Sequence, residues 1–259
     1  MRFRVDADLT YRFPAPAKVL LLLEAAHGDD QSVRSERLSI SKTLPFTRLD
    51  DVASGERRVV FLGEDTVEIA YEATVEVGER SAVLAGAAQP ALEELPPEAL
   101  PYLQPSRYCP ADRFERFVNR AFSDTAGGER VEAILAWIAA HLDYEAGVSS
   151  AATTALDTFI DRAGVCRDFA HVAISLCRAS QIPARAVSGY GWPLEPPDMH
   201  AVVEVFVGGG WRLADPTGKV EPGGLVRVAT GRDATDIAFM SIFGQAELIS
   251  QTFGIERTL

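Results

Sequence analysis

Cys166 has the sequence surroundings of a nucleophile. It lies at the start of residues 165–180, where apolar side chains recur at helical spacing. A thiol at a helix N-terminus meets the positive end of the helix dipole and free backbone N–H groups, and both favour the reactive thiolate. The alternative for a lone cysteine is a small buried apolar residue, which is what we expect for Cys109 and Cys177.

A thiol nucleophile requires a base and a group that orients the base. Of the four histidines, His200 fits best because it opens a strand, residues 200–207, whose odd-numbered side chains are apolar. The imidazole therefore lies on the other face of the strand. Glu204 shares that face, where it is either a solvated strand residue, which we favour, or a wall of the cleft. Asp215 ends the next strand, just before Pro216, and its carboxylate could bond the far ring nitrogen of His200.

Each of these residues also has an ordinary explanation. His200 could be a partly exposed strand residue, and Asp215 could serve only the turn Asp-Pro-Thr-Gly. A hairpin that sets Asp215 opposite His200 should turn near residue 207 or 208, whereas the three glycines of residues 208–210 centre on 209. A bulge or a strand offset must absorb the difference. The case for a site therefore rests on finding the three residues together and in this order.

Two aromatic residues are candidates for the walls of the site. Tyr144 is a candidate second oxyanion donor beside the backbone N–H of Cys166, although it could simply pack against the preceding helix. Trp192 lies in the loop before His200, where it could line a substrate groove or cover the edge of the sheet. For Asp168, in the first turn of the cysteine helix, we favour a structural role through its charge, with the holding of a neighbouring loop as the alternative.

The first part of the chain predicts strands without intervening helices. Apolar and polar side chains alternate over residues 2–13, which is typical of a half-buried strand, and further strand-like runs continue to residue 77. This pattern favours an antiparallel sheet or sandwich, and we expect a β-sandwich-like domain. Residues 86–110 contain six of the fifteen prolines and indicate a linker. We place the domain boundary there, which gives residues 1–105 and 106–259.

The second part of the chain predicts helices followed by strands. Helical spacing is clearest over residues 128–142 and 165–180, and β-forming residues dominate 184–189, 200–207 and 211–214. One or two more strands are expected between residues 225 and 255. Helices packed on an antiparallel sheet make this domain, and the protein as a whole, α+β.

Taken together, these motifs resemble the bacterial transglutaminase-like family. The resemblance is carried by Gly164-Val-Cys-Arg-Asp-Phe-Ala-His171, Ile182-Pro-Ala-Arg-Ala-Val-Ser-Gly189, His200-Ala201, Glu204-Val205 and Asp215-Pro-Thr217. It covers roughly residues 130–220, and the strand-rich first part is also similar to the N-terminal region of such proteins. The resemblance implies a papain-like core, with Cys166 as nucleophile, His200 as base and Asp215 as orienting acid. One departure is Val202, where many relatives have an aromatic residue.

Composition limits the partners and the compartment. The formal net charge is −12, and no basic run is present, so a nucleic-acid partner is not expected. The longest apolar run is far too short to span a membrane, and no signal peptide is evident, so we expect a cytoplasmic protein without a membrane partner. The three cysteines fit no zinc pattern, and no EF-hand run occurs, so neither a metal nor a cofactor is expected.

The sequence supports three functions. The first is a cysteine protease or amidase that hydrolyses an amide of a peptide or protein through a thioester acyl-enzyme. The second is a true transglutaminase, in which an amine replaces water in the second step. The third is a non-catalytic peptide-binding scaffold that keeps the fold. The substrate and the oligomeric state stay open at this point.

Overall fold

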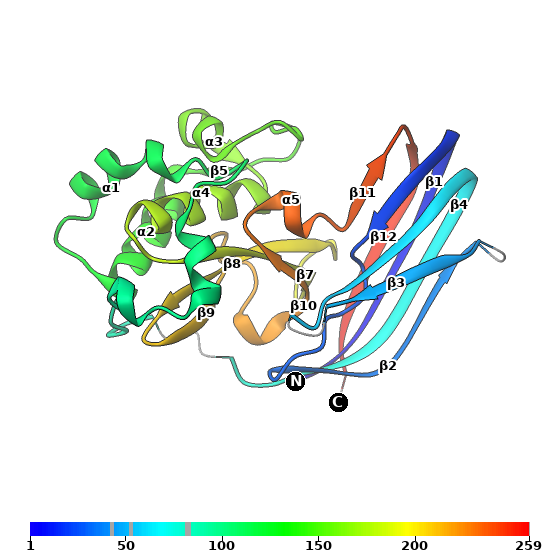
Figure 1. The fold of residues 1–259 in the computed structure, drawn as a ribbon, viewed down its shortest axis with the longest axis horizontal. Coiled ribbons are helices and arrows are strands. Elements are labelled where there is room, and N and C mark those ends of the chain that lie inside the picture. The colour runs from blue at the N-terminus through cyan, green and yellow to red at the C-terminus, as the bar shows by residue number, and fades with distance from the viewer. Residues whose placement is uncertain (42–43, 52–53, 81–83, 259) are drawn as a thin grey trace.

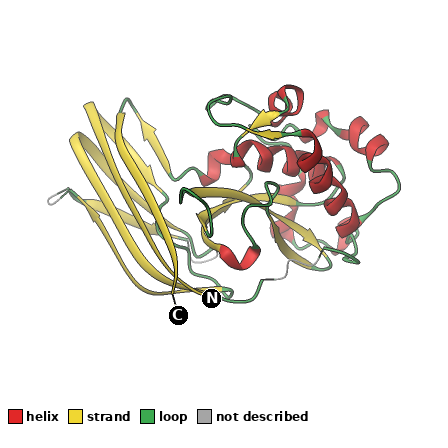
Figure 2. Cartoon of the chain, turned by 180° about the vertical axis from the view of Figure 1, so that it is seen from behind, coloured by secondary structure: helices red, strands yellow, loops and turns green. Residues whose placement is uncertain are grey.

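The computed structural model describes residues 1–41, 44–51, 54–80 and 84–258. It has the expected α+β class, with antiparallel sheets in both parts of the molecule. Figure 1 shows a sheet of long strands beside a second part in which helices surround a shorter sheet. Figure 2 shows the same division from behind, with all the helices on one side of the molecule.

Two long strands form the centre of the first sheet. These are β1 (Arg2–Leu21) and β4 (Arg57–Val77), which pair antiparallel along most of their length. Strands β2 (Gln31–Ile40) and β3 (Phe46–Asp50) both pair with β4 on its outer side. The odd-numbered side chains of β1 from Phe3 to Phe13 are buried, as the alternation predicts. Of the two expected arrangements, the strands form a single six-stranded sheet rather than two facing sheets.

The C-terminal strands belong to this first sheet. Strands β11 (Met240–Phe243) and β12 (Glu247–Thr258) pair with β1, whereas the expected division assigned residues 106–259 to the second domain. The two ends of the chain therefore lie side by side, with Arg2 opposite Thr258 (Figure 1). A strand pattern shows that a segment is extended but not which sheet it joins, so this return of the chain could not be read from periodicity.

The second part begins in the proline-rich segment. That segment is not structureless, because short 3-10 turns form at Leu92–Glu94, Pro97–Leu103 and Ala111–Arg113. The remaining elements are α1 (Glu115–Ala121), α2 (Gly127–His141), β5 (Asp143–Tyr144), α3 (Ala155–Asp161), β6 (Ala163–Gly164), α4 (Cys166–Ala179), β7 (Ala184–Gly191), β8 (Met199–Val207), β9 (Gly210–Ala214), the 3-10 turn Pro222–Gly224, β10 (Leu225–Gly231) and α5 (Ala234–Ile237). The sheet has the order β10-β7-β8-β9 and is antiparallel throughout.

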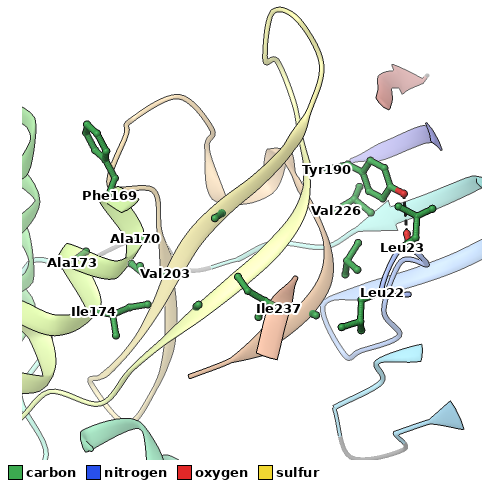
Figure 3. Packing of buried hydrophobic residues seen from close by; sticks show 14 of the residues in the cluster. Leu22, Leu23, Phe169, Ala170, Ala173, Ile174, Tyr190, Val203, Val226 and Ile237 are labelled. Atoms are coloured by element: carbon green, nitrogen blue, oxygen red, sulfur yellow. Dashed lines mark hydrogen bonds between the residues drawn. The ribbon is translucent and has the colours of Figure 1, made fainter. Parts of the chain in front are cut away.

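Helix α4 is the centre of this second part. Its residues from Asp168 to Arg178 are all buried, because α1, α2 and α3 pack around it and β7 and β8 lie beneath it. Figure 3 shows Phe169, Ala170, Ala173 and Ile174 on α4 and Val203 on the neighbouring strand β8. A helix this deeply buried holds its first residue in a fixed position relative to the sheet.

The two sheets share one apolar core. Tyr190 of β7 stacks on Tyr71 of β4 with ring centroids 6.5 Å apart. Its hydroxyl donates a hydrogen bond of 2.8 Å to the carbonyl of Leu23, drawn as a dashed line in Figure 3. Burial of an aromatic side chain contributes about 2 kcal/mol, and a buried hydroxyl keeps that gain only when it is paired. The first domain therefore contributes directly to the stability of the sheet that carries the site.

Candidate active site

Cys166 is the first residue of α4, as the sequence predicts. The helix is capped by Asp168, which is fully buried and accepts a 2.9 Å hydrogen bond from the backbone N–H of Val165. Arg167 pairs with Asp168 at 3.2 Å and also donates to the carbonyl of Ser150. The pair thus caps the helix and holds the preceding loop, so Asp168 has the structural role expected for it and also the alternative one.

Glycine is required just before the cysteine. A Cβ atom at Gly164 would lie 2.7 Å from the Cβ of Asp168 and 3.0 Å from its Oδ2, closer than real side chains approach. Gly164 also pairs with Tyr144 in the short parallel bridge of β5 and β6. The missing side chain therefore allows the capping carboxylate and the tyrosine strand to meet directly beside Cys166.

His200 and Asp215 form a direct pair. The Nε2 atom of His200 lies 2.8 Å from Oδ2 of Asp215, and each side chain is only 2% exposed. Asp215 also accepts hydrogen bonds from the backbone N–H groups of Thr217, Lys219 and Val220 and from the hydroxyl of Thr217. These donors fix the carboxylate in place. Because the carboxylate contacts Nε2 of His200, Nδ1 is the ring nitrogen left to face the thiol.

The hairpin of β8 and β9 does not set Asp215 directly opposite His200, and the difference is absorbed by an offset rather than a bulge. Val207 pairs with Gly210, and Gly208 and Gly209 form the two-residue turn with φ angles of 62° and 77°. In this register the position opposite His200 would be residue 217, and the hydroxyl of Thr217 lies 3.4 Å from Nε2. The strand ends before Asp215, so its side chain reaches diagonally back to the imidazole.

The electrostatics of the pair favour a charged imidazole. Burial alone would lower the pKa of His200, but the hydrogen bond to Asp215, the hydrogen bond to Cys166 and the charges of both partners raise the pKa to about 9. Burial opposes ionisation of Asp215, yet its hydrogen bond and charge interaction with His200 and its bonds from Thr217 lower its pKa. Cys166, His200 and Asp215 therefore form one connected chain of hydrogen bonds.

Tyr144 lies against Cys166. Its hydroxyl oxygen accepts from the backbone N–H of Cys166 and also interacts with the thiol, and burial, followed by the charge of Cys166, raises its pKa to about 12. The phenol therefore stays protonated at neutral pH and keeps a proton to donate. An acyl oxygen bound beside the sulfur would meet two donors, the N–H of Cys166 and the hydroxyl of Tyr144.

Trp192 has a different set of neighbours. Its ring centroid lies 6.1 Å from that of Phe3 in β1, and the guanidinium of Arg257 in β12 lies 5.7 Å from the ring. Its backbone N–H donates to the carbonyl of Gly224. These contacts attach the loop before His200 to the first sheet. The groove-lining role suggested for Trp192 stays a prediction.

The expectation for Glu204 is wrong. It is buried, with 5% of its surface exposed, and it pairs with Arg185 at 2.6 Å and with Arg227 at 3.2 Å. Arg185 lies directly opposite it on β7, and β10 carries Arg227 along the far edge of β7. A single strand pattern cannot show that a third strand brings a cation to the polar face, so the sequence suggested a solvated position.

Two further charged residues lie around the site. Asp198, in the loop before β8, interacts electrostatically with both His200 and Tyr144. Lys219, just after Asp215, places its ammonium 3.5 Å from the centroid of the Tyr144 ring. Both residues lie in loops of ordinary turn composition, and the only sequence signal was their closeness to the motif residues. Among residues 1–41, 44–51, 54–80 and 84–258, no group of three or more His, Cys, Asp or Glu side chains could hold a metal.

Comparisons with known proteins agree with this geometry. Residues 115–216 match the Transglutaminase-like superfamily, and residues 1–82 match the bacterial transglutaminase N-terminal domain. A solved structure of a proposed cysteine protease from Cytophaga hutchinsonii is 33% identical, covers 99% of this chain and 90% of that chain, and superposes with a TM-score of 0.91. The chain belongs to the transglutaminase-like superfamily. The expected family is therefore confirmed, and the matched core carries all three residues of the Cys-His-Asp chain.

Two further proteins are similar to parts of this transglutaminase-like chain. An uncharacterized protein of Mycobacterium leprae is 34% identical over 146 residues, so the chain spans about half, 52%, of that curated relative. The periplasmic domain of TgpA from Pseudomonas aeruginosa is 16% identical, covers 82% of this chain and 76% of that chain, and has a TM-score of 0.44. In the described part of the chain, no helix has the length and apolar character that a membrane crossing requires.

Proposed function

We propose that this transglutaminase-like protein is a cysteine hydrolase that cleaves an amide bond in a peptide or protein. The observation that supports it best is the 2.8 Å contact between buried His200 and Asp215, with the thiol of Cys166 on the other side of the imidazole. A chain of thiol, imidazole and carboxylate is the arrangement that activates a sulfur nucleophile. A scaffold without catalysis has no use for a buried ionic pair aimed at a thiol.

The reaction proceeds in two halves. His200 already holds the thiol proton at Nδ1 when the sulfur of Cys166 attacks the carbonyl carbon, and the acyl oxygen becomes negative between the N–H of Cys166 and the hydroxyl of Tyr144. The C–N bond then breaks, the imidazolium gives its proton to the leaving amine, and a thioester remains. Water attacks that thioester with the now neutral His200 as base, the C–S bond breaks, and the sulfur of Cys166 beside a protonated His200 is restored.

The test is turnover of a fluorogenic peptide library with wild-type protein and with Cys166→Ala. We expect cleavage by wild type only, and a covalent acyl adduct on Cys166 after an acid quench, located by mass spectrometry of the digested protein. The other two cysteines, Cys109 and Cys177, are buried and serve as internal controls for non-specific labelling. Cleavage by Cys166→Ala, or an adduct on another residue, would refute the assignment.

The same experiment separates hydrolysis from amine transfer. A labelled primary amine added to the reaction competes with water for the thioester. We expect the acyl group to appear chiefly as the free acid, and a product that carries mainly the labelled amine would make the protein a transglutaminase instead. The acidic surface, with net charge −12, bears on the choice of peptides, because it favours neutral or basic sequences in the library.

A further inference from the structure

The segment after β9 does more than hold the triad carboxylate. The backbone N–H of Lys219 donates to Oδ2 of Asp215 at 3.0 Å, and that of Val220 donates to the same atom at 2.9 Å. From this fixed backbone the side chain of Lys219 extends to the ring of Tyr144, where the ammonium lies 3.5 Å from the ring centroid. The ammonium of Lys219, which follows β9 of the sheet, thus lies on the ring of Tyr144, which packs beside the start of α4.

Tyr144 needs such a contact to stay in place. It lies in a strand of only two residues, β5, and 44% of its surface is exposed. Within the described ranges, the ring and cation contacts of Tyr144 are those with Phe169, at 5.8 Å between centroids, and with Lys219. Beyond the interaction of its hydroxyl with Cys166, few contacts restrict rotation of this half-exposed ring, so a contact on its face restricts it further.

The ammonium of Lys219 forms no ion pair with a carboxylate of the described residues. In the part of the chain that the structure describes, no carboxylate lies within ion-pair distance of its ammonium, although fourteen other ion pairs are present. Here the positive charge is directed instead at the π face of the residue that touches the nucleophile.

We propose that Lys219 is a positioning residue for the oxyanion hole: it holds the hydroxyl of Tyr144 beside the N–H of Cys166. The proposal rests on the proposed function, because the hole serves an acyl oxygen only if Cys166 is acylated. The cation also withdraws electron density from the ring and strengthens the hydroxyl as a donor when negative charge develops on the acyl oxygen. Lys219 touches neither thiol nor substrate in this account and acts only through Tyr144.

The test is a double-mutant cycle on the acylation of Cys166 by p-nitrophenyl acetate. The release of p-nitrophenol gives the acylation rate at saturating ester and the half-saturating concentration, and the aryl ester needs no knowledge of the natural peptide. The variants are Lys219→Met, Lys219→Arg, Tyr144→Phe and the double variant Tyr144→Phe/Lys219→Met. Methionine keeps the apolar stem and removes the charge, whereas arginine keeps the charge.

We expect Lys219→Met to slow saturated acylation about three- to tenfold, the range for one cation–π contact at a half-exposed site, with little change in the half-saturating concentration. Lys219→Arg should restore most of the rate. In the Tyr144→Phe background, the loss of Lys219 should have no further effect, because the hydroxyl through which it acts is gone.

Three results would overturn the proposal while leaving the proposed function intact. These are an unchanged rate in Lys219→Met, an equal loss in both tyrosine backgrounds, and a change confined to the half-saturating concentration. A wild-type protein whose ester cleavage does not depend on Cys166 would instead refute the proposed function, and the Lys219 proposal with it. Cys166→Ala, measured in parallel, distinguishes the two failures.

Discussion

Replacing Asp215 with asparagine should change the protonation of His200 more than any other single substitution. Asparagine has nearly the same shape and keeps one oxygen for the backbone N–H groups of Lys219 and Val220, which both donate to Oδ2, but it removes the negative charge 2.8 Å from Nε2. Burial of the imidazole is unchanged, and burial acts to lower the pKa of His200. The substitution therefore removes the largest of the contributions that oppose desolvation.

The size of the effect follows from the pKa of about 9 in the intact site. An unperturbed histidine titrates near 6.5, so the environment favours the imidazolium by roughly 3 kcal/mol, at about 1.4 kcal/mol for each pH unit. The hydrogen bond to Asp215 is the largest of the favourable contributions, and that of Cys166 follows it. We expect Asp215→Asn to lower the pKa of His200 by about two pH units or more, and Cys166→Ala to lower it less.

The assay is a titration of the histidine side chains by nuclear magnetic resonance. Four histidines are present, and the spectrum of His200→Gln identifies the signal of His200 by its absence. His171 provides an internal reference, because burial lowers its pKa to about 4 and neither substitution touches it. A pKa of His200 that stays near 9 in Asp215→Asn, in a protein whose circular dichroism is unchanged, would refute the reasoning.

Three further predictions concern stability, measured as the free energy of unfolding in urea. His171 is neutral in the fold and has a pKa of about 4, so the free energy of unfolding should fall as pH drops from 6.5 to 4, by roughly 3 kcal/mol in total, and His171→Gln should flatten that fall. Tyr190→Phe leaves the carbonyl of Leu23 without its donor and should cost about 1 to 2 kcal/mol. Gly164→Ala should cost more than about 1 kcal/mol by displacing the helix cap, whereas Gly210→Ala, with open space around its Cβ, should cost a few tenths at most.

Each of these predictions can fail separately. An equally steep acid loss in His171→Gln would mean that another group causes it. An unchanged free energy of unfolding in Tyr190→Phe would show that the contact between the two sheets contributes little. Equal costs at Gly164 and Gly210 would show that the close approach to the capping carboxylate does not constrain the backbone there.

Local patterns in the sequence predicted which candidate residues lie together. The spacing of Cys166 on a helix, His200 on a strand and Asp215 after the next strand depends on neighbouring elements only, and the structure brings them together. Composition also predicted a turn within the three glycines of residues 208–210, although only Gly208 and Gly209 form it and Gly210 begins β9. The pattern could not predict that the side chain of Asp215 extends diagonally to His200. The point where a strand ends depends on the hydrogen bonds that its last residues form, and these are not visible in the pattern.

Features that depend on distant strands were predicted less well. The strands β11 and β12 return to the first sheet, and the partners of Glu204 come from two different strands. Alternation shows which side chains share a face, but not which segment covers that face. The contact of Lys219 with Tyr144 is another case, since it joins residues 75 positions apart through loops that carry no periodic signal.

The most direct test of the central claim is the rate at which iodoacetamide alkylates Cys166 at neutral pH, in wild type and in His200→Ala. Peptide mapping by mass spectrometry after a short exposure gives the rate for each cysteine separately. If His200 activates the thiol, Cys166 should react far faster than buried Cys109 and Cys177, and His200→Ala should slow its alkylation by about tenfold or more. An equal rate in the two proteins would contradict the account.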